Sequence, residues 1–250
     1  LIRRHRALVN PRLLGASAWY VRAAAETVPT VELIDTIGAH PAVFQVIILS
    51  HRKIGITAVF RANESGEREE FERFLRQQKV IAEGFRAFDL PVRQESELTE
   101  EACRVLAGMA YDARRPLSWL ARKTKLPQRR VSAVVDTLIR DGSVIFTLDL
   151  ATGASSGTWA ELEVEGVNVA AELIAVTQSR RHLLWLSPFA GTQTLYAWVW
   201  CESAGALQTL VENLTSRSLT VKEAGVILST HGYPVWVHDE LVQRARASSH

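Results

Sequence analysis

Residues 117–140 read LSWLARKTKLPQRRVSAVVDTLIR, and this stretch decides the fold of the middle of the chain. It contains two helical patterns that are separated by only Lys125 and Leu126, with Pro127 where a first helical turn tolerates proline. The apolar residues of the second pattern recur at helical spacing: Val131, Val134, Val135, Leu138 and Ile139. So short a turn forces two helices to cross sharply, which is the helix-turn-helix geometry.

The flanking residues extend this unit. Leu98 to Met109 predicts a preceding helix, because its apolar residues also follow helical spacing, with Thr99 as a cap. Downstream, Asp141-Gly142 ends the third helix and the β-branched run from Val144 begins a strand. We therefore predict a winged helix-turn-helix over Leu98–Ile145, within a domain that spans residues 92–154.

The middle of this unit carries basic residues without acidic ones. Between Ala113 and Val135 there are seven basic residues and no Asp or Glu, although the whole chain has a net charge of only +2. A solvated basic face is one interpretation, and a surface for double-stranded DNA is the other. The second predicts base and phosphate contacts by Arg114, Arg115, Arg122, Lys123, Lys125, Gln128, Arg129, Arg130, Ser132 and Ala133.

The segments before and after this unit repeat one pattern. Each reads β-α-β-β-α-β, as in the pairs Ile56–Gly66 and Leu195–Gly205, where an apolar strand ends in a polar turn and a helix begins. This order indicates a ferredoxin-like domain, an antiparallel sheet with helices on one face. The predicted fold class is α+β, with two such domains at residues 1–91 and 155–240 flanking the winged helix-turn-helix, and a C-terminal tail at residues 241–250.

Composition limits the class of protein and the cellular compartment that we expect. The apolar fraction of 47% suits a globular core, and no apolar run is long enough to span a bilayer or to form a signal peptide. Cys103 and Cys201 lie far apart in apolar surroundings, which favours buried free thiols over a disulfide or metal site. We expect a cytoplasmic protein without membrane contact. Its opening within a strand suggests a fragment of a longer chain.

Several of these motifs resemble the Lrp/AsnC family of transcription regulators. The helix-turn-helix of that family is similar to Leu98-Thr-Glu-Glu, Val105-Leu-Ala, Leu120-Ala-Arg, Leu126-Pro, Val131-Ser and Leu138-Ile-Arg-Asp-Gly-Ser-Val-Ile. Its ligand-sensing domain is similar to Gly191-Thr-Gln-Thr-Leu-Tyr-Ala-Trp-Val-Trp, and its connecting strand to Leu1–Gly15. The resemblance implies a regulator arranged as sensor, helix-turn-helix, sensor, with a further helix-turn-helix before Leu1.

The resemblance also implies an effector, such as an amino acid, at Gly191, Thr192 and Gln193. Two departures weaken this. The first repeat has Ser50-His-Arg-Lys in place of the glycine, and the second has Pro188-Phe189 before it. A homodimer or larger assembly is expected, because sheet faces rich in Trp and Val need covering and pairing with another sheet would cover them.

Two other functions remain open. Siroheme decarboxylases share this architecture, and the chain offers His40, His51, Arg52, Arg180, Arg181 and His182 for a tetrapyrrole's carboxylates, with Arg181-His182 nearest to a suitable strand. It lacks the His-Asn-Tyr and Tyr-Asn-Met-Trp-Phe-like runs of those enzymes. The second of the two open functions is a ligand-free assembly module. Because no catalytic constellation is visible, we predict no catalytic residues, no cofactor, no metal and no enzymatic activity.

Overall fold

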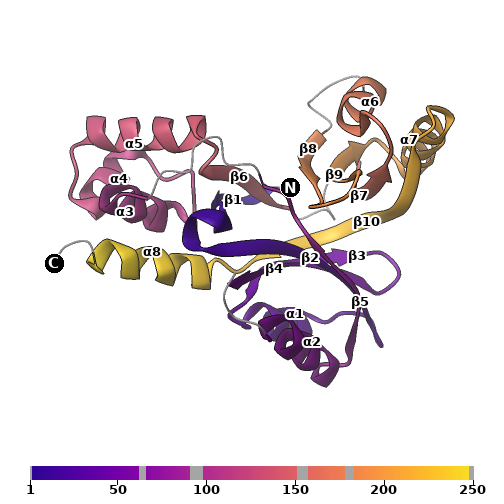
Figure 1. Ribbon diagram of the computed structural model, residues 1–250, viewed down its shortest axis with the longest axis horizontal. Helices are drawn as coiled ribbons and strands as arrows, with labels where there is room; N and C mark the ends of the chain where they lie inside the picture. Colours follow the sequence, from indigo (N-terminus) through magenta and orange to yellow (C-terminus); the bar gives the residue numbers. More distant parts are fainter. Residues whose placement is uncertain (1, 62–65, 91–97, 151–156, 178–182, 248–250) are drawn as a thin grey trace.

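The structure is a computed structural model, and it describes residues 2–61, 66–90, 98–150, 157–177 and 183–247 (Figure 1). Both predicted repeats are present. The first comprises β2 (Ala16–Ala25), α1 (Val31–Gly38), β3 (Val43–Leu49), β4 (Lys53–Arg61), α2 (Glu67–Gln77) and β5 (Val80–Ala87). The second comprises β7 (Thr158–Glu165), α6 (Val169–Val176), β8 (Leu183–Pro188), β9 (Thr194–Cys201), α7 (Ala204–Ser216) and β10 (Thr220–Gly232). The β-α-β-β-α-β order and the mixed α+β class are confirmed.

Alternation along the strands explains the layers. On β7, Ala160, Leu162 and Val164 are fully buried and pack with apolar residues of α6 and α7. The side chains between them point to the opposite face of the sheet, because successive residues of a strand alternate. Helix starts are fixed locally, as at Thr30, whose hydroxyl accepts the N–H of Leu33, and at Ser203, which does the same for Ala206.

The two repeats form one sheet. Its strand order is β5-β2-β4-β3-β10-β7-β9-β8, and the long strand β10 belongs to both halves. The stretch Thr220–Ile227 pairs with β7, whereas Ile227–Gly232 pairs with β3. The outer edges approach each other again where Phe88 bridges to Phe189. The sheet is thus folded so that its halves face each other, with α1 and α2 outside one half and α6 and α7 outside the other (Figure 1).

Aromatic residues from both halves fill the space between them. The hydrophobic core between the half-sheets consists of Ala18, Tyr20, Ile47, Leu49, Phe88, Phe189, Tyr196, Trp198 and Ile227. The apolar sheet faces that were expected to need a partner molecule are therefore covered within one chain. This removes the reason for which a homodimer was predicted, and the homodimer itself stays a prediction.

The central helices form the expected helix-turn-helix. They are α3 (Glu100–Met109), α4 (Leu117–Thr124) and α5 (Gln128–Arg140). The turn is tight because Lys125 takes a left-handed conformation, with φ of 57°, and the N–H of Leu126 bonds to the carbonyl of Ala121 at 3.1 Å. Pro127 caps the start of α5.

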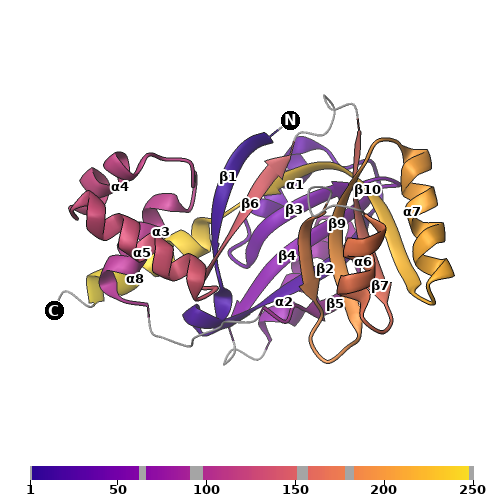
Figure 2. The ribbon, with the colours of Figure 1, turned by 90° about the horizontal axis from the view of Figure 1, so that it is seen from above.

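The strand after α5 differs from the predicted wing. β6 (Val144–Leu150) pairs with β1 (Ile2–Val9) from the chain start, as an antiparallel two-stranded sheet seen beside the helices in Figure 2. Within the described part of the chain, β6 has no hairpin partner after it. The unit is therefore a helix-turn-helix linked to the sheet by a pair of strands, and the local strand pattern alone did not reveal the distant partner.

The C-terminal boundary also needs correction. α8 (Val235–Ala247) crosses residue 240, where we placed the start of a tail. It begins directly after β10 and packs on α3, with Val237 and Leu241 buried in the core of the helical unit. Residues 1–91, 92–154 and 155–240 are therefore not independent segments. None of the described helices is both long enough and apolar enough to cross a membrane.

Candidate functional site

A row of polar side chains lies between the two half-sheets. On β2, Tyr20 and Arg22 point inward, and on β7 Glu161 and Glu163 do the same. Their exposed fractions are 1%, 9%, 0% and 2%, so the alternation of each strand has placed charge in the interior. Buried charge is rare unless it is paired, so these four residues call for a structural or chemical role.

Glu161 is the centre of this row. The hydroxyl of Tyr20 donates to both of its carboxylate oxygens, at 2.8 and 2.7 Å, and the hydroxyl of Tyr196 donates to Oε2 at 2.7 Å. Trp198 Nε1 donates in turn to the Tyr196 hydroxyl at 2.7 Å. One buried carboxylate therefore organises two phenols from opposite half-sheets. We call Tyr20, Arg22, Glu161, Glu163 and Tyr196 the buried cluster.

Arg22 supplies the compensating charge. Its Nη2 lies 2.6 Å from Glu161 Oε1 and 3.4 Å from Glu163 Oε1, and its Nη1 lies 2.6 Å from Glu223 Oε2. Arg86 on β5 forms a second ion pair with Glu163. These ion pairs connect β2, β5, β7 and β10 and run from the buried Arg22, Glu161 and Glu163 to Arg86 and Glu223, whose side chains are nearly half exposed.

The cluster holds its protons tightly. Burial raises the pKa of Glu161 above its usual 4.5, although Arg22 and the two tyrosine hydrogen bonds oppose this. Burial likewise raises the pKa of Glu163. The pKa values of Tyr20 and Tyr196 lie well above 10, because burial and the Glu161 charge both disfavour phenolate. The tyrosines are therefore neutral hydrogen-bond donors at physiological pH.

Space for the cluster is built into the strands. A Cβ at Gly55 would lie 2.7 Å from the Tyr20 hydroxyl, so only glycine leaves room for this ring beside β4. Among the described residues, three buried side-chain polar atoms have no hydrogen-bond partner, and two of them lie in this region: Arg22 Nε and Ser187 Oγ. Ser187 lies opposite Tyr196 in the β8–β9 ladder, so its hydroxyl shares the inward face. Unpaired buried groups are uncommon and indicate room for a further hydrogen-bond partner.

An open cleft adjoins the cluster, and we call it the β5–β8 cleft. It has a volume of about 570 Å³, within the roughly 300–1,000 Å³ of small-molecule sites. Its walls combine aromatic rings with two cations: Trp19, Phe85, Phe189, Arg86 and Lys222. Lys222 forms an ion pair with Glu165 at 2.7 Å, and Glu165 also lines the cleft.

Arg86 and Phe189 separate the cleft from the cluster. The Arg86 guanidinium lies 5.4 Å from the centre of the Phe189 ring and also binds Glu163. Phe189 is buried, stacks on Phe88 at 5.3 Å, and has its ring centre 6.3 and 6.0 Å from those of Tyr20 and Tyr196. A group bound in the cleft would therefore meet Arg86 first, with the tyrosines one ring behind it.

Of the three predicted effector residues, Thr192 lines this cleft and the other two are its neighbours in the chain. Gly191, Thr192 and Gln193 form the exposed turn between β8 and β9, where Gly191 has a φ of 70° that favours glycine. Thr192 lines the cleft, and its hydroxyl donates to the Phe189 carbonyl at 3.2 Å. The turn thus fixes Phe189. Effector binding by these residues stays a prediction.

The predicted DNA-contacting residues gather on α4, α5 and the segment before them. All are exposed except Ser132, which is half-buried: Arg114, Arg115, Arg122, Lys123, Lys125, Gln128, Arg129, Arg130 and Ala133. Two of them are engaged within the protein. Arg130 Nε lies 2.6 Å from Glu101 Oε2 on α3, and Arg115 stacks over Trp119 at 5.1 Å.

The histidines and arginines considered for a tetrapyrrole do not converge. His40 packs against Phe71 and Phe74 of α2 with tilted rings, and burial lowers its pKa. His51 and Arg52 occupy the exposed turn between β3 and β4. Arg180, Arg181 and His182 lie outside the described residues. The interior residues that do converge were missed, although one signal was present: Glu161 and Glu163 alternate with apolar residues on a strand predicted to be half-buried.

No protein-family model matches this sequence, and no curated protein matches it. Solved structures do. A crystal structure of the siroheme decarboxylase NirDL in complex with an iron-uroporphyrin III analogue matches with a TM-score of 0.57 and 12% identity, over 97% of this chain and 84% of that one. A second structure of NirDL gives 0.55 and 13%, over 100% and 85%. The leucine response regulatory protein LrpA of Mycobacterium tuberculosis covers only 53% of this chain, with a TM-score of 0.35 and 21% identity.

Over its whole length, the fold of this chain is therefore similar to that of the siroheme decarboxylase NirDL. This overturns the prediction that the chain is not an enzyme, which rested on the lack of a recognisable sequence motif. A site assembled across two half-sheets leaves no such motif, because its residues come from strands far apart in the sequence.

Proposed function

We propose that this protein is a decarboxylase of a carboxylate-bearing tetrapyrrole, which binds in the β5–β8 cleft. The observation that carries the proposal is the link that Arg86 makes between this cleft and the buried cluster. The full-length likeness to siroheme decarboxylase NirDL supports the architecture, and its bound iron-uroporphyrin III analogue suggests the substrate class.

The cleft suits such a ligand. Aromatic side chains offer flat surfaces to a macrocycle, and Arg86 and Lys222 offer charge to its carboxylates. Both cations are held by carboxylates, Glu163 and Glu165, which a ligand carboxylate would replace. The Arg86 guanidinium can donate two parallel hydrogen bonds to one carboxylate, so it would fix the acetate side chain of the tetrapyrrole that reacts.

The chemistry needs one proton. When an acetate side chain loses CO₂, the bond between its methylene and carboxyl carbons breaks and the electron pair remains on the methylene carbon. That carbon then takes a proton and becomes a methyl group. We assign this proton to the tyrosine pair on Glu161, because these phenols are protonated and lie behind Phe189. Reaching them requires Phe189 to turn aside.

Binding is tested by titrating the protein with iron-uroporphyrin III and following the absorbance of the macrocycle. We expect a saturable spectral change. Arg86→Gln and Lys222→Gln should each weaken it by about tenfold, the usual effect of removing a charge-assisted hydrogen bond. Arg76→Gln, on the exposed surface of α2, is the matched control. Absence of any change in the wild type, or equal affinity in all variants, would refute the cleft as the site.

A second function is supported by the helix-turn-helix. The exposed basic residues of α4 and α5 favour binding to double-stranded DNA, as proposed from the sequence. The packing of α8 on α3 leaves Arg122, Lys125 and Arg129 exposed. Salt-sensitive binding to duplex DNA, lost when these three are replaced by glutamine, would support this function. Its absence at low salt would exclude it.

A further inference from the structure

A second cavity lies apart from the sheet, between α3, α4 and α8, and we call it the α3–α8 cleft. Its volume is about 600 Å³. Four of the residues that line it are small and apolar, and they form an apolar strip along the wall: Ala107, Gly108, Val242 and Ala245. A small-residue wall leaves space that the surrounding core does not fill. The proposed decarboxylation does not use this cleft.

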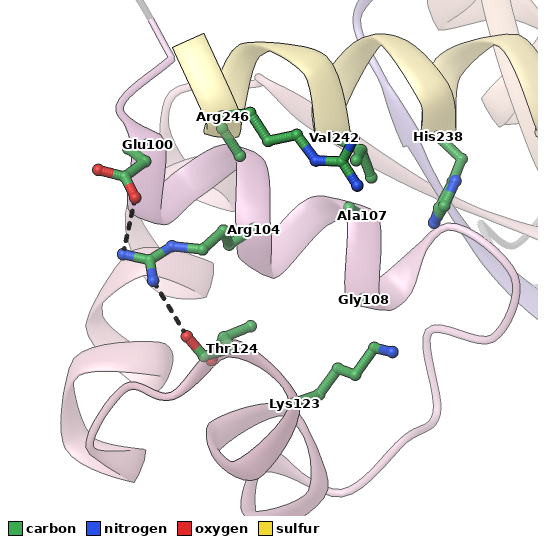
Figure 3. Close-up of a pocket in the computed structure, with 10 residues that line it drawn as sticks. Glu100, Arg104, Ala107, Gly108, Lys123, Thr124, His238, Val242 and Arg246 are labelled. Atoms are coloured by element: carbon green, nitrogen blue, oxygen red, sulfur yellow. Dashed lines mark hydrogen bonds and ion pairs between the residues drawn. The ribbon is translucent and has the colours of Figure 1, made fainter. Parts of the chain in front are cut away.

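Three cations reach it from three different helices. Arg104 comes from α3, Lys123 from α4 and Arg246 from α8, and Figure 3 shows their side chains around the same space. Among the described residues that line the cleft, Glu100 is the one carboxylate, and it lies 3.3 Å from Arg104. The lining therefore has an excess of positive charge. Like charges brought together in folding are unfavourable unless a counter-ion joins them.

Arg104 has hydrogen-bonding capacity left over. Its Nη1 donates to the Thr124 carbonyl at 3.3 Å and its Nη2 faces Glu100, as the dashed lines in Figure 3 show. Its Nε is buried and has no hydrogen-bond partner. His238 adds a further polar group from α8, with its ring 5.2 Å from that of Tyr111.

We propose that the α3–α8 cleft binds an organic monoanion with an apolar body. The small apolar residues would contact the body, while Arg104 and Arg246 would hold the anionic head and Lys123 would lie at the entrance. An inorganic anion would leave the apolar wall unused, so the site should prefer a carboxylate with a hydrocarbon chain. The ligand would join α8, which continues from β10, to the helix-turn-helix.

Isothermal titration calorimetry with octanoate tests this proposal on the full chain. The wild type should bind octanoate and should bind inorganic phosphate at least tenfold more weakly. Lys123→Gln and Arg246→Gln should each weaken the binding of octanoate about tenfold. Both residues are at the surface of the fold, so these variants should unfold at the same urea concentration as the wild type. Arg217→Gln, on α7, should leave binding unchanged.

Four results would overturn it. These are no octanoate binding, equal affinity in Lys123→Gln and Arg246→Gln, phosphate bound as tightly as octanoate, or octanoate lost in Arg86→Gln. The last would place the acid in the β5–β8 cleft. Because tetrapyrrole binding is measured separately there, failure of one proposal leaves the other standing.

Discussion

Arg22 illustrates how charge is accommodated inside this molecule. It lies between Glu161, Glu163 and Glu223, from β7 and β10, while its own strand belongs to the other half-sheet. Burial alone would lower the pKa of Arg22, but the surrounding carboxylates raise it above its ordinary value. The guanidinium therefore stays charged, and the two buried glutamates depend on it for compensation.

Arg22→Met should lower the free energy of unfolding by about 3–5 kcal/mol, because it leaves buried carboxylates without their cation. Arg76→Met removes an exposed ion pair with Glu72 and should cost no more than about 1 kcal/mol. Urea unfolding followed by tryptophan fluorescence measures both. Equal effects of the two substitutions would show that the buried cluster is solvated and unimportant for stability.

The raised pKa of Glu161 makes a distinct pH prediction. The folded protein holds this proton to higher pH than the unfolded chain, whose value is near 4.5. The contribution of Glu161 to stability is therefore complete below pH 4.5 and is lost as pH rises through the folded-state pKa.

The difference in unfolding free energy, wild type minus Glu161→Gln, should fall as pH rises from below 4.5 through that range. Subtracting the variant removes the titration of other carboxylates. Urea unfolding at a series of pH values gives the difference. A difference that grows with pH would mean that Arg22 and the tyrosines lower the pKa of Glu161 more strongly than burial raises it.

At this scale the sequence revealed the strands but not the cluster. Glu161 and Glu163 alternate with Ala160 and Leu162, a pattern that predicts one buried face and one solvated face. The second face is in fact covered by the other half-sheet, which carries Tyr20 and Arg22. Only the tertiary pairing shows that an acidic face meets a cationic one.

Among the elements, those set by local interactions were predicted best. The α4–α5 turn depends on Lys125 and its neighbours, and the strands and helices of both repeats follow alternation or helical spacing. β6 and α8 were misjudged for one reason. Each is placed by a distant partner, β1 for the strand and α3 for the helix, which no local pattern specifies.

The structure ranks the predicted contacts of α5. Arg129 is exposed, whereas Arg130 is held by Glu101 and must leave this ion pair to meet a base. For a duplex that the protein binds specifically, Arg129→Ala should cost roughly 1–3 kcal/mol and relax the sequence preference. Arg130→Ala should cost less. Fluorescence anisotropy measures both, and a larger loss for Arg130→Ala would contradict this ranking of α5.

At the scale of the whole molecule, β10 determines the architecture. It pairs with β7 of its own repeat and with β3 of the other, and so folds the two half-sheets over a shared interior. The repeat could be read from the sequence, but this closure could not, because it depends on strands from opposite ends of the chain. The candidate site exists only through this closure, since its residues come from both halves.

The most direct test of the proposed activity follows the tetrapyrrole itself. The protein is incubated with siroheme, and the products are identified by mass spectrometry. We predict loss of CO₂ from acetate side chains. The double variant Tyr20→Phe, Tyr196→Phe should bind siroheme but react roughly 10²–10⁴-fold more slowly, the usual contribution of a proton donor. Siroheme that binds the wild type and remains intact, or a double variant that reacts at the wild-type rate, would contradict this account.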